Sequence, residues 1–126
     1  MRKSNPLSTS LLVLGVFVGF LVCAPLLSRA HSPATSVTIV NNSSREIRHV
    51  YLSPPDQNNW GPDQLGSSVI AAGGGSVTLS DVACSGAGVK VITEDHEGCF
   101  LSQIVACSEA TTWTITSEAI PDCGTE

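Results

Sequence analysis

Residues 50–66 of this chain read VYLSPPDQNNWGPDQLG, and they mark where extended structure gives way to a loop. A strand-like run ends at Pro54-Pro55, because proline donates no hydrogen bond to a sheet. A polar loop follows, with Trp60 between an asparagine and a glycine. Such a loop must be held in a fixed shape, which makes it the first candidate for a binding site. Its candidate residues are Tyr51, Asp56, Asn58, Trp60 and Asp63.

The same loop also has a purely structural interpretation. Asp and Asn side chains cap turns by accepting hydrogen bonds from nearby backbone groups. Trp60 is large enough to plug one end of a small core, with its indole N–H near water. These roles account for the composition without any ligand.

Working outward from the loop, β-branched runs alternate with turn residues along the rest of the chain. A fold built from many short strands and glycine-rich turns is typical of sandwiches and barrels. The sequence therefore predicts an all-β fold, a small antiparallel β-sandwich or barrel of about seven strands. The predicted strands lie within residues 36–41, 46–53, 69–71, 76–79, 89–93, 99–107 and 111–116.

Pairing and burial follow from the same pattern. A turn at 42–45 predicts that the first two strands form a hairpin, and the glycines at 73–75 predict another around 69–79. Within the last two strands the expected buried residues are Phe100, Ile104, Val105 and Trp113.

The N-terminus has the features of a secretory signal peptide. Arg2 and Lys3 precede an apolar run over 11–22, and residues 28–30 offer small side chains where a signal peptidase cuts. A membrane anchor is the alternative, although the apolar run is at the short limit for a spanning helix. Lipidation at Cys23 is a third reading, but Val22 stands where a lipobox has a small residue.

Cleavage after Ala30 divides the chain into a signal peptide (1–30) and a single β domain (31–126). We expect an ordered core at about 36–116 and an irregular C-terminal tail. The protein would then be secreted or periplasmic, with no stable membrane insertion after cleavage. Removing 30 of the 126 residues leaves 96, with three basic and eleven acidic side chains and a formal charge of −8. That acidity argues against nucleic acid and anionic membrane surfaces as partners.

Four cysteines remain in the predicted mature chain, at Cys84, Cys99, Cys107 and Cys123. An even number in a short exported chain predicts disulfides, each worth about 2–4 kcal/mol. Zinc is disfavoured because no close C-x-x-C pair occurs. An extended stretch between Cys99 and Cys107 would hold them too far apart to bond. Two pairings stay open: Cys84–Cys107 with Cys99–Cys123, or Cys84–Cys99 with Cys107–Cys123.

The sequence suggests two hypotheses of metal binding, one for calcium and one for copper. Asp56, Asn58 and Gly61 imitate the start of an EF-hand, but Trp60 and Ser67 stand where ligands are needed. A looser calcium site could be shared between this loop and an acid of a later turn, Glu94, Asp95 or Glu97. Copper would suit an N-terminal histidine that binds through its amine and imidazole, with a second histidine nearby. The candidate ligands are His31, His49, His96, Glu94, Asp95 and Glu97.

No catalytic motif is present in the sequence. There is no G-x-S-x-G segment and no histidine–glutamate spacing typical of a metal hydrolase. Bridged cysteines leave no thiol nucleophile, so no nucleophile, base and orienting partner can be assembled. We therefore expect that the protein is not an enzyme.

Parts of the chain resemble a family of small exported bacterial β-proteins of unknown function. That family carries Tyr-x-Ser-Pro followed by Trp-Gly-x-Asp-x-Leu-Gly, matched here over 51–54 and 60–66. The resemblance covers most of 36–116 and is most specific over 37–66. Some members are labelled argininosuccinate lyase, a large helical enzyme that does not fit this chain. Members often carry cysteines matching Cys84 and Cys107, which implies the pairing Cys84–Cys107 with Cys99–Cys123.

Taken together, the sequence predicts an exported, disulfide-stapled β domain without catalytic activity. Its expected role is that of an interaction module of the periplasm or cell exterior. We expect an unknown protein or cell-envelope partner and no obligatory cofactor. A calcium- or copper-binding protein is the alternative.

Overall fold

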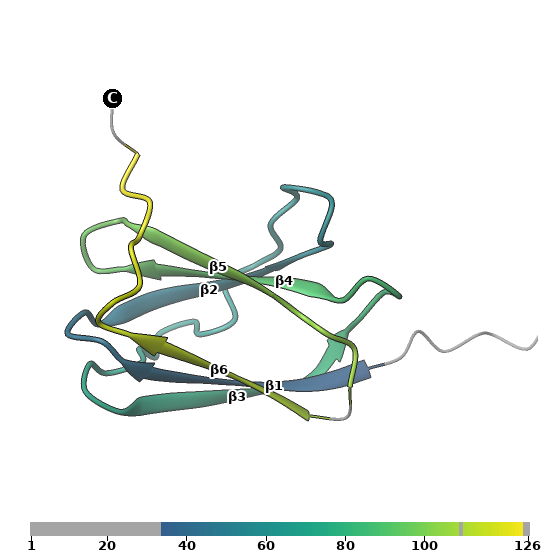
Figure 1. Cartoon of the computed structure of the whole chain (residues 1–126), viewed down its shortest axis with the longest axis horizontal. Helices are drawn as coiled ribbons and strands as arrows, with labels where there is room; N and C mark the ends of the chain where they lie inside the picture. Colours follow the sequence, from purple (N-terminus) through teal and green to yellow (C-terminus); the bar gives the residue numbers. More distant parts are fainter. Residues whose placement is uncertain (1–33, 109, 125–126) are drawn as a thin grey trace, which may run out of the picture.

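The computed structural model describes residues 34–108 and 110–124, which form six β-strands and no helix (Figure 1). The strands are β1 (Ala34–Asn42), β2 (Ile47–Ser53), β3 (Gly75–Ala83), β4 (Val89–Asp95), β5 (Phe100–Val105) and β6 (Ala110–Thr116). The all-β prediction is confirmed, with six strands in this part of the chain rather than about seven. Over the same residues no helix could cross a membrane. The predicted signal peptide (1–30) and His31 lie outside the described residues.

The strands form two three-stranded sheets stacked face to face, as Figure 1 shows, with orders β3-β1-β6 and β2-β4-β5. In the first sheet β1 is antiparallel to β3 but parallel to β6, and the second sheet is antiparallel throughout. The expectation of a wholly antiparallel fold is therefore wrong at one pair. The predicted first hairpin is also wrong, because the turn after β1 carries the chain across to the other sheet.

The predicted strand over 69–71 is absent. Only Ile70 pairs, in an isolated bridge with Ile47 of β2. The backbone then turns tightly, since the Gly75 N–H donates to the carbonyl of Ala71 and Gly74 adopts a φ of 117°. This conformation belongs to glycine, so the three glycines end the loop where β3 begins.

The core lies between the sheets, and along β1 its residues follow a period of two. Val37 and Ile39 of β1 and Val91 of β4 are fully buried. Leu65 and Ile70, from the long loop between β2 and β3, join the same core.

Two residues predicted as buried lie on the outer face instead. Phe100 is only partly buried and Ile104 is 50% exposed. Both belong to β5, where they face Glu94 and Lys90 of β4 across the sheet. Their position in the pleat points them away from the core. Val105 is buried as predicted, and Trp113 packs partly buried against the core.

All four predicted disulfide cysteines are paired, as Cys84–Cys107 and Cys99–Cys123. This is the pairing that the family resemblance implies. The first bond joins the end of β3 to the segment after β5, and the second holds the C-terminal tail against the start of β5. Such bonds persist in oxidising surroundings, so they favour a location outside the cytoplasm.

The side chain of Asn41, at the end of β1, is fully buried. Its Nδ2 donates to the carbonyls of Arg45 and Ile70, at 2.7 and 3.2 Å. Its Oδ1 accepts from the backbone N–H and the hydroxyl of Ser43, at 3.2 and 2.6 Å. One amide therefore joins β1, the crossing turn and the loop before β3.

We predict that Asn41→Ala lowers the free energy of unfolding by about 2–4 kcal/mol, because it leaves buried backbone groups unpaired. Urea unfolding followed by tryptophan fluorescence measures the change. The adjacent Asn42 is exposed, so Asn42→Ala is the matched control and should change stability by no more than about 0.5 kcal/mol. Equal effects of the two substitutions would contradict the role given to the buried amide.

Candidate functional site

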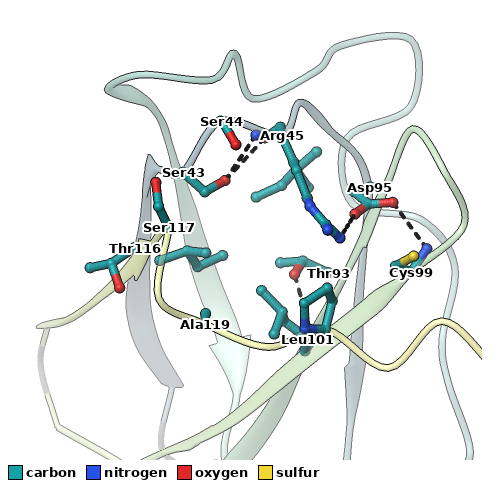
Figure 2. Close-up of a pocket in the computed structure, with 13 residues that line it drawn as sticks. Ser43, Ser44, Arg45, Thr93, Asp95, Cys99, Leu101, Thr116, Ser117 and Ala119 are labelled. Atoms are coloured by element: carbon teal, nitrogen blue, oxygen red, sulfur yellow. Dashed lines mark hydrogen bonds and ion pairs between the residues drawn. The ribbon is translucent and has the colours of Figure 1, made fainter.

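Three hollows among the described residues differ in size and lining. The smallest, about 30 Å³, lies at one end of the sandwich (Figure 2). Arg45 crosses it to Asp95, with Nη1 and Oδ2 3.0 Å apart. A volume of this size holds about one water molecule, so it is a structural cavity.

A larger groove of about 350 Å³ lies between the end of β2 and the segment around Cys84. Its lining is mostly apolar, and its two serines are both engaged within the protein. The Ser53 hydroxyl donates to the carbonyls of Pro54 and Gln57, and that of Ser85 donates to the carbonyl of Gly88. The groove therefore offers few free polar groups to orient a ligand.

The third hollow, about 140 Å³, lies on the outer face of the β2-β4-β5 sheet beside Trp60. It combines aromatic, apolar, neutral polar and charged side chains. We call it the Trp60 groove. Its lining consists of Asn58, Trp60, Lys90, Ile92, Phe100, Leu101, Ser102 and Asp122.

Aromatic rings from three segments meet at this groove. Tyr51 and Trp60 are stacked with ring centroids 5.4 Å apart, and Phe100 meets Trp60 edge to face at 5.1 Å. The imidazole of His49 extends the line, 6.1 Å from the ring of Tyr51. We call these four residues the aromatic row. They come from β2, from the loop after it and from the first residue of β5.

Local sequence explains how the row assembles. Val50 is buried, so its neighbours His49 and Tyr51 point to the outer face of β2. Beyond the proline pair, the Gln57 N–H donates to the carbonyl of Pro54, which turns the chain back. The Gly61 N–H then donates to the carbonyl of Leu52 at 3.0 Å and brings the loop to the strand edge. Trp60 is thereby laid over the outer face.

The rest of the loop closes the free edge of β2. The Gln64 N–H donates to the carbonyl of Val50, and Ile47 and Ile70 exchange two backbone hydrogen bonds. The Val50 N–H donates to Oδ1 of Asp63 at 3.0 Å, so a side chain takes the place of a strand. An exposed edge invites pairing with another chain, and this loop removes it.

Asp63 is the centre of that closure. Its Oδ1 also accepts from the Leu65 N–H at 3.0 Å, and its Oδ2 lies 2.8 Å from Nδ1 of His49. Burial opposes ionisation, but the hydrogen bonds from His49 and from the two backbone N–H groups outweigh it. The pKa of Asp63 is therefore held below its ordinary value of 3.8.

Two acidic side chains, Glu94 and Asp63, lie near Tyr51 of the aromatic row. Its hydroxyl donates to Oε2 of Glu94 at 3.1 Å. Burial, this hydrogen bond and the negative charges of Glu94 and Asp63 together raise the pKa of Tyr51 above its ordinary value of 10.0. The phenol stays protonated and fixed as a donor at neutral pH.

The structure separates the five predicted binding-loop residues. Asn58 and Trp60 line the groove, and the ring of Tyr51 stacks against that of Trp60. Asp63 is a structural cap, whereas Asp56 is exposed and does not line the groove. The prediction that Trp60 plugs the end of the core is wrong, because this ring lies on the outer face and is 41% exposed.

Six residues of the groove were missed by the sequence analysis: Lys90, Ile92, Phe100, Leu101, Ser102 and Asp122. Phe100 and Ser102 share a face of β5 by the period of two, so that pattern contained a signal for them. The sequence contained no signal for Lys90 and Asp122, because their positions beside the groove depend on the paths of the long loop and of the C-terminal tail. Asp122 is held by two backbone hydrogen bonds to Phe100, at 2.7 and 2.8 Å.

Among the described residues, the predicted metal ligands fall into separate groups. His49 and Glu94 face each other between β2 and β4, and each has a hydrogen-bond partner already named. His96 is exposed, and its Nε2 lies 4.0 Å from Oε1 of Glu97. His31 lies outside the described residues.

Asp95 and Glu97 lie close to the sulfur of Cys99, but this sulfur is in a disulfide. Asp95 is buried, which opposes ionisation. Hydrogen bonds from the Cys99 and Glu97 N–H groups and from Arg45 still hold its pKa below the ordinary value. These partners explain the charge of Asp95 without a metal ion. The calcium and copper hypotheses stay predictions.

No protein-family model matches this sequence, and no curated protein matches it either. An NMR structure of a protein from Eubacterium rectale is similar in fold, with a TM-score of 0.48 and 14% sequence identity. The match covers 71% of this chain and 82% of that one. It says nothing about what the protein binds.

We predict that Asp63→Ala lowers the free energy of unfolding by roughly 1–3 kcal/mol, because the Val50 and Leu65 N–H groups lose their acceptor. Urea unfolding at neutral pH measures the loss. Asp56 belongs to the same loop and is exposed, so Asp56→Ala is the matched control and should be nearly neutral. A loss of the same size in both variants would contradict the edge-closing role.

The lowered pKa values of Asp63 and Asp95 make the free energy of unfolding depend on pH in the acid range. Because the fold favours their ionised forms, their contribution is complete well above the ordinary value of 3.8 and is lost as pH falls through and below it. We expect Asp63→Asn to lose less stability than the wild type between pH 5 and pH 2. Unfolding curves across this range test the expectation, and parallel pH profiles would contradict it.

Proposed function

We propose that the protein is an exported binding module without catalytic activity that works through the Trp60 groove. One observation carries the proposal: the rings of Tyr51, Trp60 and Phe100 gather on the outer face of the sheet, where Trp60 is 41% exposed. Aromatic side chains of this kind provide much of the binding energy at interaction sites. A cell-envelope component of the periplasm or cell exterior is the expected partner.

Export is supported by two independent features. The predicted signal peptide would direct the domain out of the cytoplasm, and disulfides such as these two persist in oxidising surroundings. A high acidic charge and the closed edge of β2 both oppose aggregation, which suits an exported protein.

Binding is favoured over catalysis by the partners of His49. Its contact with Asp63 resembles the base and orienting acid of a hydrolase. Within the described residues, however, no serine, threonine or cysteine forms a hydrogen bond with His49, and the four cysteines there are bridged. The pair instead fixes the loop that presents Trp60.

Cosedimentation with isolated cell envelopes tests the proposed function. The full chain, expressed through an export pathway and purified in its oxidised form, should be retained on envelopes. Trp60→Ala should weaken retention by about tenfold or more, as expected for an aromatic anchor. Val69 is 49% exposed and lies outside the groove, so Val69→Ala is the matched control and should be retained like the wild type.

Circular dichroism and thiol titration establish that each variant is folded and oxidised before retention is compared. A folded Trp60→Ala protein that sediments as well as the wild type would contradict the proposed site. Failure of the wild type to bind envelopes at all would contradict the proposed function.

A further inference from the structure

From the lining of the Trp60 groove we infer that its ligand is a neutral sugar ring within an oligosaccharide. This inference rests on the proposed function and specifies the ligand class of the same site. Four properties of the groove lead to it: balanced charge, mixed hydrogen-bonding capacity, an aromatic wall and a small volume.

The charges of the lining cancel. Lys90 and Asp122 are the two charged side chains among the described residues that line the groove. A cationic ligand would face the ammonium of Lys90, and an anionic one would face the carboxylate of Asp122. A neutral ligand carries no charge that would be buried beside a like charge of the groove, whether that of Lys90 or that of Asp122.

The polar groups offer both donors and acceptors. The Lys90 ammonium donates to the Gln57 carbonyl at 2.9 Å and to Oδ1 of Asn58 at 3.1 Å, which leaves one N–H of Lys90 and the NH₂ of Asn58 for a ligand. Asp122 accepts from the Gly124 N–H through Oδ1, which leaves Oδ2. The exposed Ser102 hydroxyl can donate or accept. Sugar hydroxyls do both, so they match this mixture.

The wall of the groove suits the apolar side of a sugar. The rings of Phe100 and Trp60 meet at an angle of 61°, while Ile92 and Leu101 add aliphatic surface. The C–H groups of a pyranose carry partial positive charge and pack against the negative face of an aromatic ring. The polar groups then meet the hydroxyls around the rim.

Size and surroundings restrict the ligand further. A groove of about 140 Å³ corresponds to roughly five water molecules, which is close to one sugar ring. A peptide that extended this sheet would need a free backbone edge beside the groove. That edge is occupied along β2 by the loop, and on β5 it is occupied at Phe100 by Asp122.

NMR titration of the ¹⁵N-labelled, oxidised full chain, expressed through an export pathway, tests the inference. The neutral probes are cellohexaose, mannohexaose and xylohexaose, with glucose, mannose and xylose to separate chain ligands from free sugars. Choline and glucuronic acid are the charged comparisons. We expect at least one hexaose to shift the Trp60 indole and Ser102 amide signals, with a Kd in roughly the millimolar range.

Variants separate recognition from folding. Trp60→Ala should weaken hexaose binding by about tenfold or more. Ser102 is exposed on β5, so Ser102→Ala should keep the fold and weaken binding by about threefold to tenfold through a lost hydrogen bond. Val69→Ala should bind like the wild type.

The inference is overturned if none of the three hexaoses shifts these signals, or if choline or glucuronic acid does so at lower concentration. Retention on envelopes that depends on Trp60 without any hexaose binding would overturn the sugar ligand and leave the proposed function standing. If Trp60 binds a protein of the envelope instead of a sugar, the sugar ligand is likewise overturned and the proposed function stands. If the wild type neither sediments with envelopes nor binds a hexaose, the proposed function and the sugar ligand are both overturned.

Discussion

The buried amide of Asn41 is the constraint on which the arrangement of the two sheets depends. All four of its hydrogen-bonding positions are used, and its partners lie in β1, in the turn that leads to β2 and in the loop that leads to β3. Its backbone carbonyl also accepts from the Gly74 N–H. A buried amide is tolerated only when it is fully paired, so these segments must meet at this point. The chain therefore crosses between sheets here instead of forming a hairpin.

The long loop combines two roles that its sequence alone does not separate. Asp63, Gln64 and Leu65 close the edge of β2 and complete the core, whereas Asn58 and Trp60 form one wall of the groove. Anchoring the first set fixes the position of the second. This division explains why a segment can be needed for the fold and still present a binding surface. A ring that packs between Tyr51 and Phe100 is held in place before any ligand arrives, which reduces the entropy lost on binding.

The far side of the groove depends on the C-terminal tail. Asp122 is brought there by its pairing with Phe100, and the Cys99–Cys123 bond joins the neighbouring residues. A disulfide stabilises a small domain chiefly by restricting its unfolded chain. This one also keeps a charged side chain beside the aromatic row. Stability and site geometry are thus linked through a bond that needs an oxidising compartment to form.

The sequence by itself determined the all-β class, the disulfide cysteines and the position of the loop, because alternation, cysteine number and proline act locally. The family resemblance added the pairing of those cysteines. Only the tertiary structure decided the remaining features: which strands share a sheet, the parallel pairing of β1 with β6, and the outward face of Phe100. The same holds for the groove, where Trp60, Lys90 and Asp122 meet from segments far apart in the chain. A period of two gives strands two faces but does not say which face is covered. That choice depends on where distant backbone is anchored, here by Asn41 and Asp63.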